Sequence, residues 1–145
     1  MIMISSAAGV TLAEKIGAAQ ARVVVIGLGY VGLPLAAAFA EAGLTTVGLE
    51  IDDRKAGSVM EGVSYIDDVA GDTLARQVAA GSLRATTDPG VLAEADVAII
   101  CVPTPYSKTK QPDLTCISQA AGIVGEHLHP GMLVILESTD RKSVV

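Results

Sequence analysis

Aromatic side chains are nearly absent from this chain of 145 residues, which has no tryptophan, one phenylalanine and three tyrosines. The hydrophobic half of the composition therefore consists mainly of alanine, valine, leucine and isoleucine. Small aliphatic side chains suit parallel strands that are buried on both faces beneath helices. A chain of this length is expected to form one ordinary domain with its own core.

Cysteine and basic residues are also scarce. The two cysteines, Cys101 and Cys116, form neither a metal-binding spacing nor a disulfide framework. Reduced thiols in a cytoplasmic protein are therefore expected, and no metal site is. Ten lysines and arginines stand against 16 aspartates and glutamates, which gives a net charge of −6. This acidic balance disfavours nucleic acid and anionic membranes as partners.

A membrane span is not expected either. The run from Val23 to Ala40 carries no charge, and about 18 apolar residues are the lower limit for a spanning helix. Three glycines and Pro34 interrupt this run, and its hydrophobic period changes midway. A strand, a tight turn and a helix explain the run better. The first residues also lack the positively charged start of a secretory signal.

Strands and helices are predicted to alternate along the chain. Strands are predicted at 22–26, 45–51, 83–86, 97–102 and 132–136, and helices at 11–19, 33–42, from 52 onward, and at 71–80, 88–95 and 115–128. Thr11 and Glu14 fit a capping box at the start of the first helix. The alternation favours parallel pairing through right-handed crossovers. We therefore expect an α/β fold with a doubly wound parallel sheet (Rossmann), with five strands present and the chain truncated before the sixth.

A glycine-rich turn follows the first predicted strand, in the pattern Gly27-x-Gly29-x-x-Gly32. In a dinucleotide-binding fold the first glycine permits the tight turn and the second lets the backbone approach a pyrophosphate. The third lets the helix pack closely on the strand. The start of the helix would attract the anion with its free N–H groups and its dipole. The alternative is a strand–turn–helix that needs glycine for its shape alone.

An acidic residue ends the second predicted strand. Glu50 lies where a ribose-binding carboxylate is expected, about 20 positions beyond the turn. Such a carboxylate accepts hydrogen bonds from the ribose hydroxyls and repels a 2′-phosphate, so NAD is expected rather than NADP. The alternative is a solvated charge at a strand end. Arg54 is able in principle to bind a 2′-phosphate, but with Glu50, Asp52 and Asp53 near it we expect Arg54 to flank the adenine.

Longer strings in the chain resemble a known family. GLGYVGLPLA (27–36), CVPTP (101–105), PDL (112–114) and LESTD (136–140) resemble motifs of the UDP-glucose/GDP-mannose dehydrogenase family, in the same order and at similar spacings. The similarity covers about residues 12–139. Within the family, the string VPTPYSKTKQPDL, together with LAEKI (12–16) and SYIDDV (64–69), is most similar to the branch that oxidises UDP-N-acetylglucosamine. Relatives that oxidise UDP-glucose or UDP-N-acetylmannosamine share the core motifs.

The resemblance implies a domain division and roles for single residues. Residues 1–20 form an N-terminal extension with a short helix, 21–139 the NAD-binding Rossmann domain, and 140–145 an aberrant tail. Thr139 is the only implied catalytic residue, because in relatives it orients the water of the second oxidation step. The implied cofactor-binding residues are Gly27, Gly29, Tyr30, Val31, Gly32, Glu50, Arg54, Val102, Pro103, Thr104, Pro105, Ser138 and Thr139.

The family's reaction needs more than these residues. Relatives oxidise C6 of a nucleotide sugar to the acid with two NAD, through a covalent thiohemiacetal on a cysteine. That nucleophilic cysteine, its partner lysine and asparagine and the sugar-binding domain belong to later segments, and this sequence departs from the family pattern after Thr139. We therefore expect the chain to be an inactive piece of a UDP-sugar dehydrogenase that is homo-oligomeric at full length. The alternative is a stand-alone, non-catalytic NAD-binding or interaction module.

Overall fold

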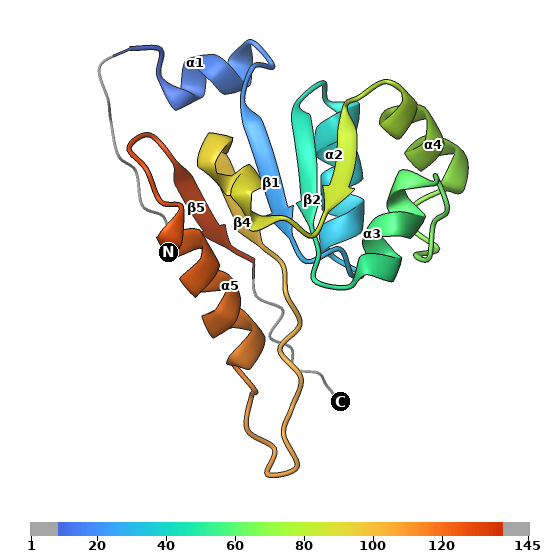
Figure 1. Ribbon diagram of the computed structural model, residues 1–145, viewed down its shortest axis with the longest axis vertical. Helices are drawn as coiled ribbons and strands as arrows, with labels where there is room; N and C mark the ends of the chain where they lie inside the picture. Colours follow the sequence, from blue (N-terminus) through green and yellow to red (C-terminus); the bar gives the residue numbers. More distant parts are fainter. Residues whose placement is uncertain (1–8, 138–145) are drawn as a thin grey trace.

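Five parallel strands form the centre of the computed structural model, which describes residues 9–137 (Figure 1). The strands are β1 (Arg22–Ile26), β2 (Thr45–Leu49), β3 (Leu83–Thr86), β4 (Val97–Ile100) and β5 (Leu133–Leu136). They lie in the order β3-β2-β1-β4-β5, and every neighbouring pair is parallel. The predicted doubly wound sheet is therefore confirmed, because the chain order reverses direction at β1.

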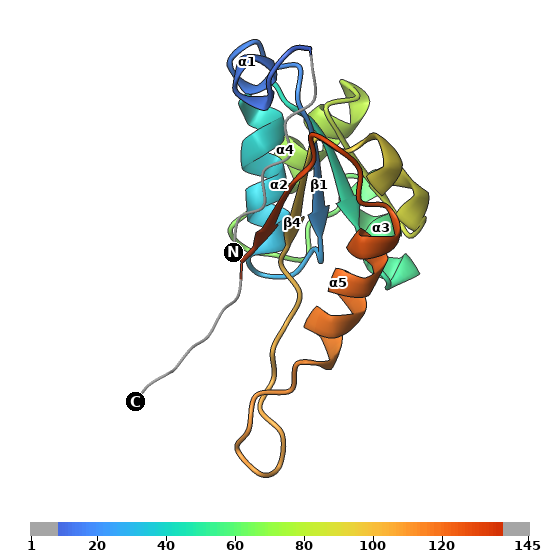
Figure 2. The same cartoon turned by 90° about the vertical axis from the view of Figure 1, so that its left-hand side faces the viewer.

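Helices cover both faces of this sheet (Figure 2). The helical elements are α1 (Leu12–Gly17), α2 (Gly32–Glu41), α3 (Asp53–Met60), α4 (Gly71–Ala79), the 3₁₀ helix η1 (Pro89–Glu94) and α5 (Thr115–Glu126). Val23 and Val25 pack in one core cluster with residues of α2, α3 and α4. Val24 and Ile26 pack on the other face with residues of η1 and α5. The β-branched run of β1 is thus buried on both sides, as expected for a central parallel strand.

Several predicted boundaries were wrong. The second strand ends at Leu49 rather than at residue 51, because the Glu50 carboxylate accepts the backbone N–H groups of Ile51 and Asp52 and turns the chain. The fourth strand ends at Ile100, shortly before Pro103, which has no N–H to donate to a ladder. The helix predicted after Asp88 begins at the predicted cap and ends at Glu94, but it is the 3₁₀ helix η1.

The short helix before β1 is held against the domain. Thr11 and Glu14 form the predicted capping box on α1. Lys15 Nζ lies 2.8 Å from an Asp96 carboxylate oxygen, and the other oxygen of Asp96 accepts the Arg22 amide at 2.8 Å. Asp96 therefore ties α1 to the start of β1 and to the residue before β4.

Two features lie at the margins of the sheet. Residues 101–114 leave β4 as a long arm that projects beyond the strands in both views, closed by an antiparallel bridge between Tyr106 and Pro112 (Figures 1 and 2). Among the described residues, β5 pairs only with β4 and so forms an edge. No helix within residues 9–137 is long and apolar enough to cross a membrane.

Candidate functional site

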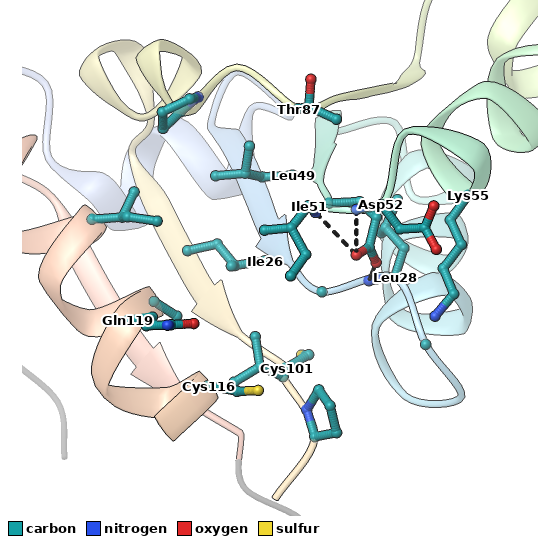
Figure 3. A pocket seen from close by; sticks show the side chains of 18 of the residues that line it. Ile26, Leu28, Leu49, Ile51, Asp52, Lys55, Thr87, Cys101, Cys116 and Gln119 are labelled. Carbon is teal, nitrogen blue, oxygen red and sulfur yellow. Dashed lines mark hydrogen bonds between the residues drawn. The ribbon is translucent and has the colours of Figure 1, made fainter. Parts of the chain in front are cut away.

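A cleft of about 900 Å³ opens at the carboxyl ends of the central strands (Figure 3). Ligands of open parallel sheets bind at this edge, where the strand order reverses. Gln119 and Cys116 reach it from α5, and Ile51, Asp52 and Lys55 reach it from the opposite side. The lining residues are 26–31, 49–52, Lys55, Thr87, Pro89, 101–103, Cys116, 118–120, Gly122, Ile123, Glu126 and Glu137.

The three glycines of the turn differ in what surrounds them. Gly27 has a φ of +93°, and a Cβ there would lie 2.8 Å from the carbonyl oxygen of Cys101. A Cβ on Gly32 would lie 1.7 Å from the carbonyl oxygen of Gly27. No atom lies within 4 Å of the equivalent position on Gly29. Gly27 and Gly32 are therefore needed by the fold itself, whereas Gly29 leaves open space on the cleft.

The start of α2 borders this open space. Val31 occupies its N-cap position and makes no side-chain hydrogen bond, so no side chain caps the helix. The uncapped first turn and the helix dipole favour an anion at this place. Tyr30, 82% exposed, and Val31 both line the cleft beside the turn.

Glu50 is buried rather than solvated, with 8% of its surface exposed. One carboxylate oxygen accepts the Leu28 amide at 2.9 Å, and the other accepts the amides of Ile51 at 3.0 Å and Asp52 at 3.2 Å (Figure 3). Hydrogen bonds from backbone N–H groups stabilise an ionised carboxylate. The carboxylate is therefore fixed between the end of β2 and the glycine turn, so the residues present fit a dinucleotide.

Lys55, and not Arg54, is the cation of this segment that lines the cleft. Arg54 is not among the residues that line the cleft. Its side chain is 92% exposed, and its guanidinium pairs with Asp52 at 3.2 Å. That hydrogen bond holds the pKa of the Asp52 carboxyl below its usual range. The next residue, Lys55, lines the cleft, and its ammonium lies 5.9 Å from the centre of the Tyr65 ring. A place for Arg54 beside the adenine thus stays a prediction.

Tyr65 contacts the turn, although the sequence pattern pointed to no role for it. Its hydroxyl donates to the carbonyl oxygen of Leu28 at 2.7 Å. Burial, and then the negative charges of Glu50 and Asp52, raise the pKa of Tyr65 to about 12. The Leu28 side chain is fully buried against Gly48, where a Cβ would lie 2.5 Å from it. Gly48 could have been noticed as a glycine inside a strand, which marks a close approach.

Some of the other expected site residues line the cleft and some do not. Val102 and Pro103 line the cleft, whereas Gly32, Thr104 and Pro105 do not. Thr104 and Pro105 continue into the projecting arm. Ser138 and Thr139 lie outside the described residues.

The thiols and the acidic groups of the cleft suggest no catalytic centre of their own. Cys101 is buried, and burial followed by the charge of Glu137 raises its pKa to about 11, so the thiol stays protonated at neutral pH. Cys116 lines the cleft from the first turn of α5. Within residues 9–137, no three His, Cys, Asp or Glu side chains lie close enough together to hold a metal.

Dehydrogenases of nucleotide sugars are among the known proteins with the same arrangement. The chain is 40% identical over 116 residues to the UDP-N-acetyl-D-mannosamine dehydrogenase of Salmonella typhi, covering 79% of this chain and 27% of that protein. It is 41% identical over 116 residues to the NDP-N-acetyl-D-galactosaminuronic acid dehydrogenase of Ralstonia nicotianae, with the same coverage. The chain therefore spans about a quarter of the length of these relatives.

Solved structures agree with this comparison. The UDP-D-ManNAc dehydrogenase of Pyrococcus horikoshii superposes with a TM-score of 0.76 at 38% identity, over 81% of this chain and 28% of that one. The GDP-mannose dehydrogenase of Pseudomonas aeruginosa, solved as a ternary complex, gives a TM-score of 0.76 at 28% identity, over 82% of this chain and 28% of that one. A family model described as "UDP-glucose/GDP-mannose dehydrogenase family, NAD binding domain" matches residues 21–142. This chain belongs to the UDP-glucose/GDP-mannose dehydrogenase family of NAD-dependent oxidoreductases and carries its NAD-binding domain.

Proposed function

We propose that this chain is the NAD-binding part of a nucleotide-sugar 6-dehydrogenase that acts on a UDP-N-acetylhexosamine. The observation that carries the proposal is the fixed Glu50 carboxylate beside the open space at Gly29. A ribose diol and a pyrophosphate need those two features at neighbouring points of one cleft. A stand-alone module is not favoured, since each relative described above carries a dehydrogenase name.

Different residues bind the different parts of NAD. The turn Gly27–Gly32 and the uncapped start of α2 receive the pyrophosphate. Glu50 accepts the ribose hydroxyls, and Val102 and Pro103 support the nicotinamide half at the end of β4. Ser138 and Thr139 complete this half of the site, with Thr139 orienting water. When bound, NAD supplies the acceptor for the hydride that leaves C6 of the sugar.

The first candidate for the sugar nucleotide is UDP-N-acetylglucosamine. It is supported by the strings VPTPYSKTKQPDL and SYIDDV, which are typical of that branch. The relatives named for N-acetylmannosamine and N-acetylgalactosaminuronic acid support an N-acetylhexosamine in general. Homo-oligomeric assembly of the full-length protein belongs to the same proposal.

A domain exchange tests whether this NAD site supports the family reaction. Residues 21–137 of this chain replace the matching part of the Salmonella typhi relative, and NADH formation is followed at 340 nm with UDP-N-acetylmannosamine. The chimera should be active, whereas the 145-residue chain alone should form no NADH with any UDP-sugar. Steady NADH formation by the chain alone, abolished by Thr139→Ala, would show that the chemistry has been misplaced.

The sugar is tested on the product of the gene that encodes this chain, expressed together with the DNA that follows it. UDP-N-acetylglucosamine, UDP-N-acetylmannosamine and UDP-glucose are compared by kcat/KM. The largest value should belong to UDP-N-acetylglucosamine. A clear preference for UDP-glucose would contradict the N-acetylhexosamine assignment without affecting the NAD site.

A further inference from the structure

Leu28 is the second residue of the glycine turn. Its N–H group, its carbonyl group and its side chain all contact other residues. Its N–H donates to Glu50 at 2.9 Å, and its carbonyl accepts the Tyr65 hydroxyl at 2.7 Å. Its side chain is fully buried, in the space that Gly48 leaves in β2. The two side chains that hold the backbone come from different segments, one from the end of β2 and one from the connection between α3 and α4.

We propose that Tyr65 is a positioning residue of the NAD site, which acts through the carbonyl of Leu28 to fix the glycine turn before NAD arrives. The peptide plane that Tyr65 holds joins Leu28 to Gly29, the glycine with open space toward the cleft. Tyr65 itself does not line the cleft and so does not touch the dinucleotide in this role. Rotation of that plane would move the backbone on which the pyrophosphate rests.

The contacts of Tyr65 separate its ring from its hydroxyl. The half-buried ring packs against the core cluster that contains Leu28, and this packing does not need the hydroxyl. Lys55 lies over the ring at 5.9 Å from its centre, which places a cation beside the aromatic face. The hydroxyl meanwhile reaches a backbone carbonyl 37 residues earlier in the chain. This hydrogen bond joins the α3–α4 connection to the backbone of the turn.

The expected effect follows from the population of the binding-competent turn. If the turn is free to leave its conformation, the measured Kd for NAD rises by the inverse of the fraction that remains competent. One hydrogen bond changes such an equilibrium by up to about tenfold. Tyr65→Phe removes the hydroxyl alone and keeps the ring and its contact with Lys55. We therefore expect this variant to bind NAD about three- to tenfold more weakly.

Thr46→Val is the matched control. Thr46 is 1% exposed, and its hydroxyl donates to the Leu44 carbonyl at 3.0 Å near the start of β2, at the opposite end from the cleft. Both substitutions remove one hydroxyl-to-carbonyl hydrogen bond, and both should lower the melting temperature. Only Tyr65→Phe should raise the Kd for NAD, measured by titration calorimetry. Equal NAD affinity in Tyr65→Phe and the unmodified chain would overturn the proposal and leave the NAD site itself intact.

A second measurement needs no variant and decides the matter if Tyr65→Phe does not fold. Amide exchange of the unmodified chain is followed by NMR in the absence of NAD. Because the turn is held beforehand, the Leu28 amide should exchange at least about threefold more slowly than an unstructured peptide. Exchange of Leu28 at the unstructured rate without NAD, followed by protection on adding NAD, would mean that NAD orders the turn. That result would overturn the proposal.

Discussion

At the scale of single residues, we expect Glu50 to set the choice between the two nicotinamide dinucleotides. Its carboxylate lies beside the cleft and faces any 2′-phosphate as a like charge. We expect the chain to bind NAD at least about tenfold more tightly than NADP, because repulsion between close like charges costs at least about 1.4 kcal/mol at a partly buried site. Titration calorimetry with both dinucleotides measures this ratio.

The Glu50→Ala variant tests the cause of that preference. This variant should bind NAD more weakly, while its affinity for NADP should change little. The ratio of the two affinities should therefore become smaller. Lys55, which also lines the cleft, then becomes the cation available to a 2′-phosphate, whereas Arg54 is paired with Asp52. Adding Lys55→Ala to Glu50→Ala should weaken NADP again, and adding Arg54→Ala should not. Equal binding of both dinucleotides by the unmodified chain would refute the role of Glu50.

Gly32 is a residue whose replacement should damage the fold. An alanine Cβ would lie 1.7 Å from the carbonyl oxygen of Gly27, so backbone must move. Overpacking of this kind costs about 1–3 kcal/mol or more of unfolding free energy. Gly125→Ala is the control of opposite sign, because Gly125 lies in α5 with no atom within 4 Å of the added carbon. That change should stabilise by about 0.4–1 kcal/mol. Urea unfolding measures both variants.

The pKa of Tyr65 predicts how stability depends on alkaline pH. The folded state raises this pKa from 10.0 to about 12. Below pH 10 the hydroxyl is protonated in both states, and its contribution to stability is complete. As the pH rises toward 12 the unfolded chain loses the proton first, so the contribution is lost. The difference in unfolding free energy between the unmodified chain and Tyr65→Phe should therefore be constant from pH 7 to 9 and shrink above pH 10. A difference that stays constant to pH 11.5 would contradict this.

At the scale of elements, the sequence predicted what depends on local pattern. Strand β3 was placed at its observed bounds, since LRAT is flanked by a glycine and by the Asp88-Pro89 helix start. The capping box of α1 was also predicted, because both of its hydrogen bonds lie within one turn. Errors of boundary occurred where a side chain from the same segment turned the backbone, as Glu50 does after β2.

Contacts between distant segments could not be predicted in this way. The approach of Tyr65 to Leu28 joins residues 37 positions apart, and no periodicity records such a pairing. Whether Arg54 or Lys55 lines the cleft depends on which face of α3 turns toward it. Lys55 lines the cleft, whereas the Arg54 side chain donates to Asp52, the N-cap residue of α3. The hydrophobic pattern of a sequence predicts where a helix or strand lies. It does not predict the direction in which a single polar side chain at the end of that element points.

At the scale of the whole molecule, the edge at β5 predicts self-association of the 145-residue chain. Within residues 9–137 this strand pairs only with β4, and Leu136 is 41% exposed. An unpaired apolar edge is a template for another chain. We expect light scattering to show dimers or larger species, and NAD to reduce them and raise the melting temperature through mass action. A monomer that melts cooperatively above about 60 °C, high for a mesophilic domain, would contradict this.

A pair of lysine substitutions distinguishes pairing at the β5 edge from nonspecific association. Leu136→Lys places a charge on the edge strand and should reduce self-association. Val63→Lys changes a residue that is 55% exposed in the connection between α3 and α4, away from the edge. It should leave self-association unchanged. The same effect from both lysines would mean that net charge, and not the edge, controls association.

The empty space over Gly29 allows a substitution that is useful in genetic experiments on this protein. Because no atom lies within 4 Å of the added carbon and the backbone there is not left-handed, alanine should be accepted without loss of protein. The same methyl group would occupy the room that a dinucleotide needs. Gly29→Ala would thus be a separation-of-function allele, which keeps the polypeptide at its normal abundance and removes its use of NAD. Any phenotype of a gene deletion that this allele does not reproduce would come from the physical presence of the protein and not from its binding of NAD.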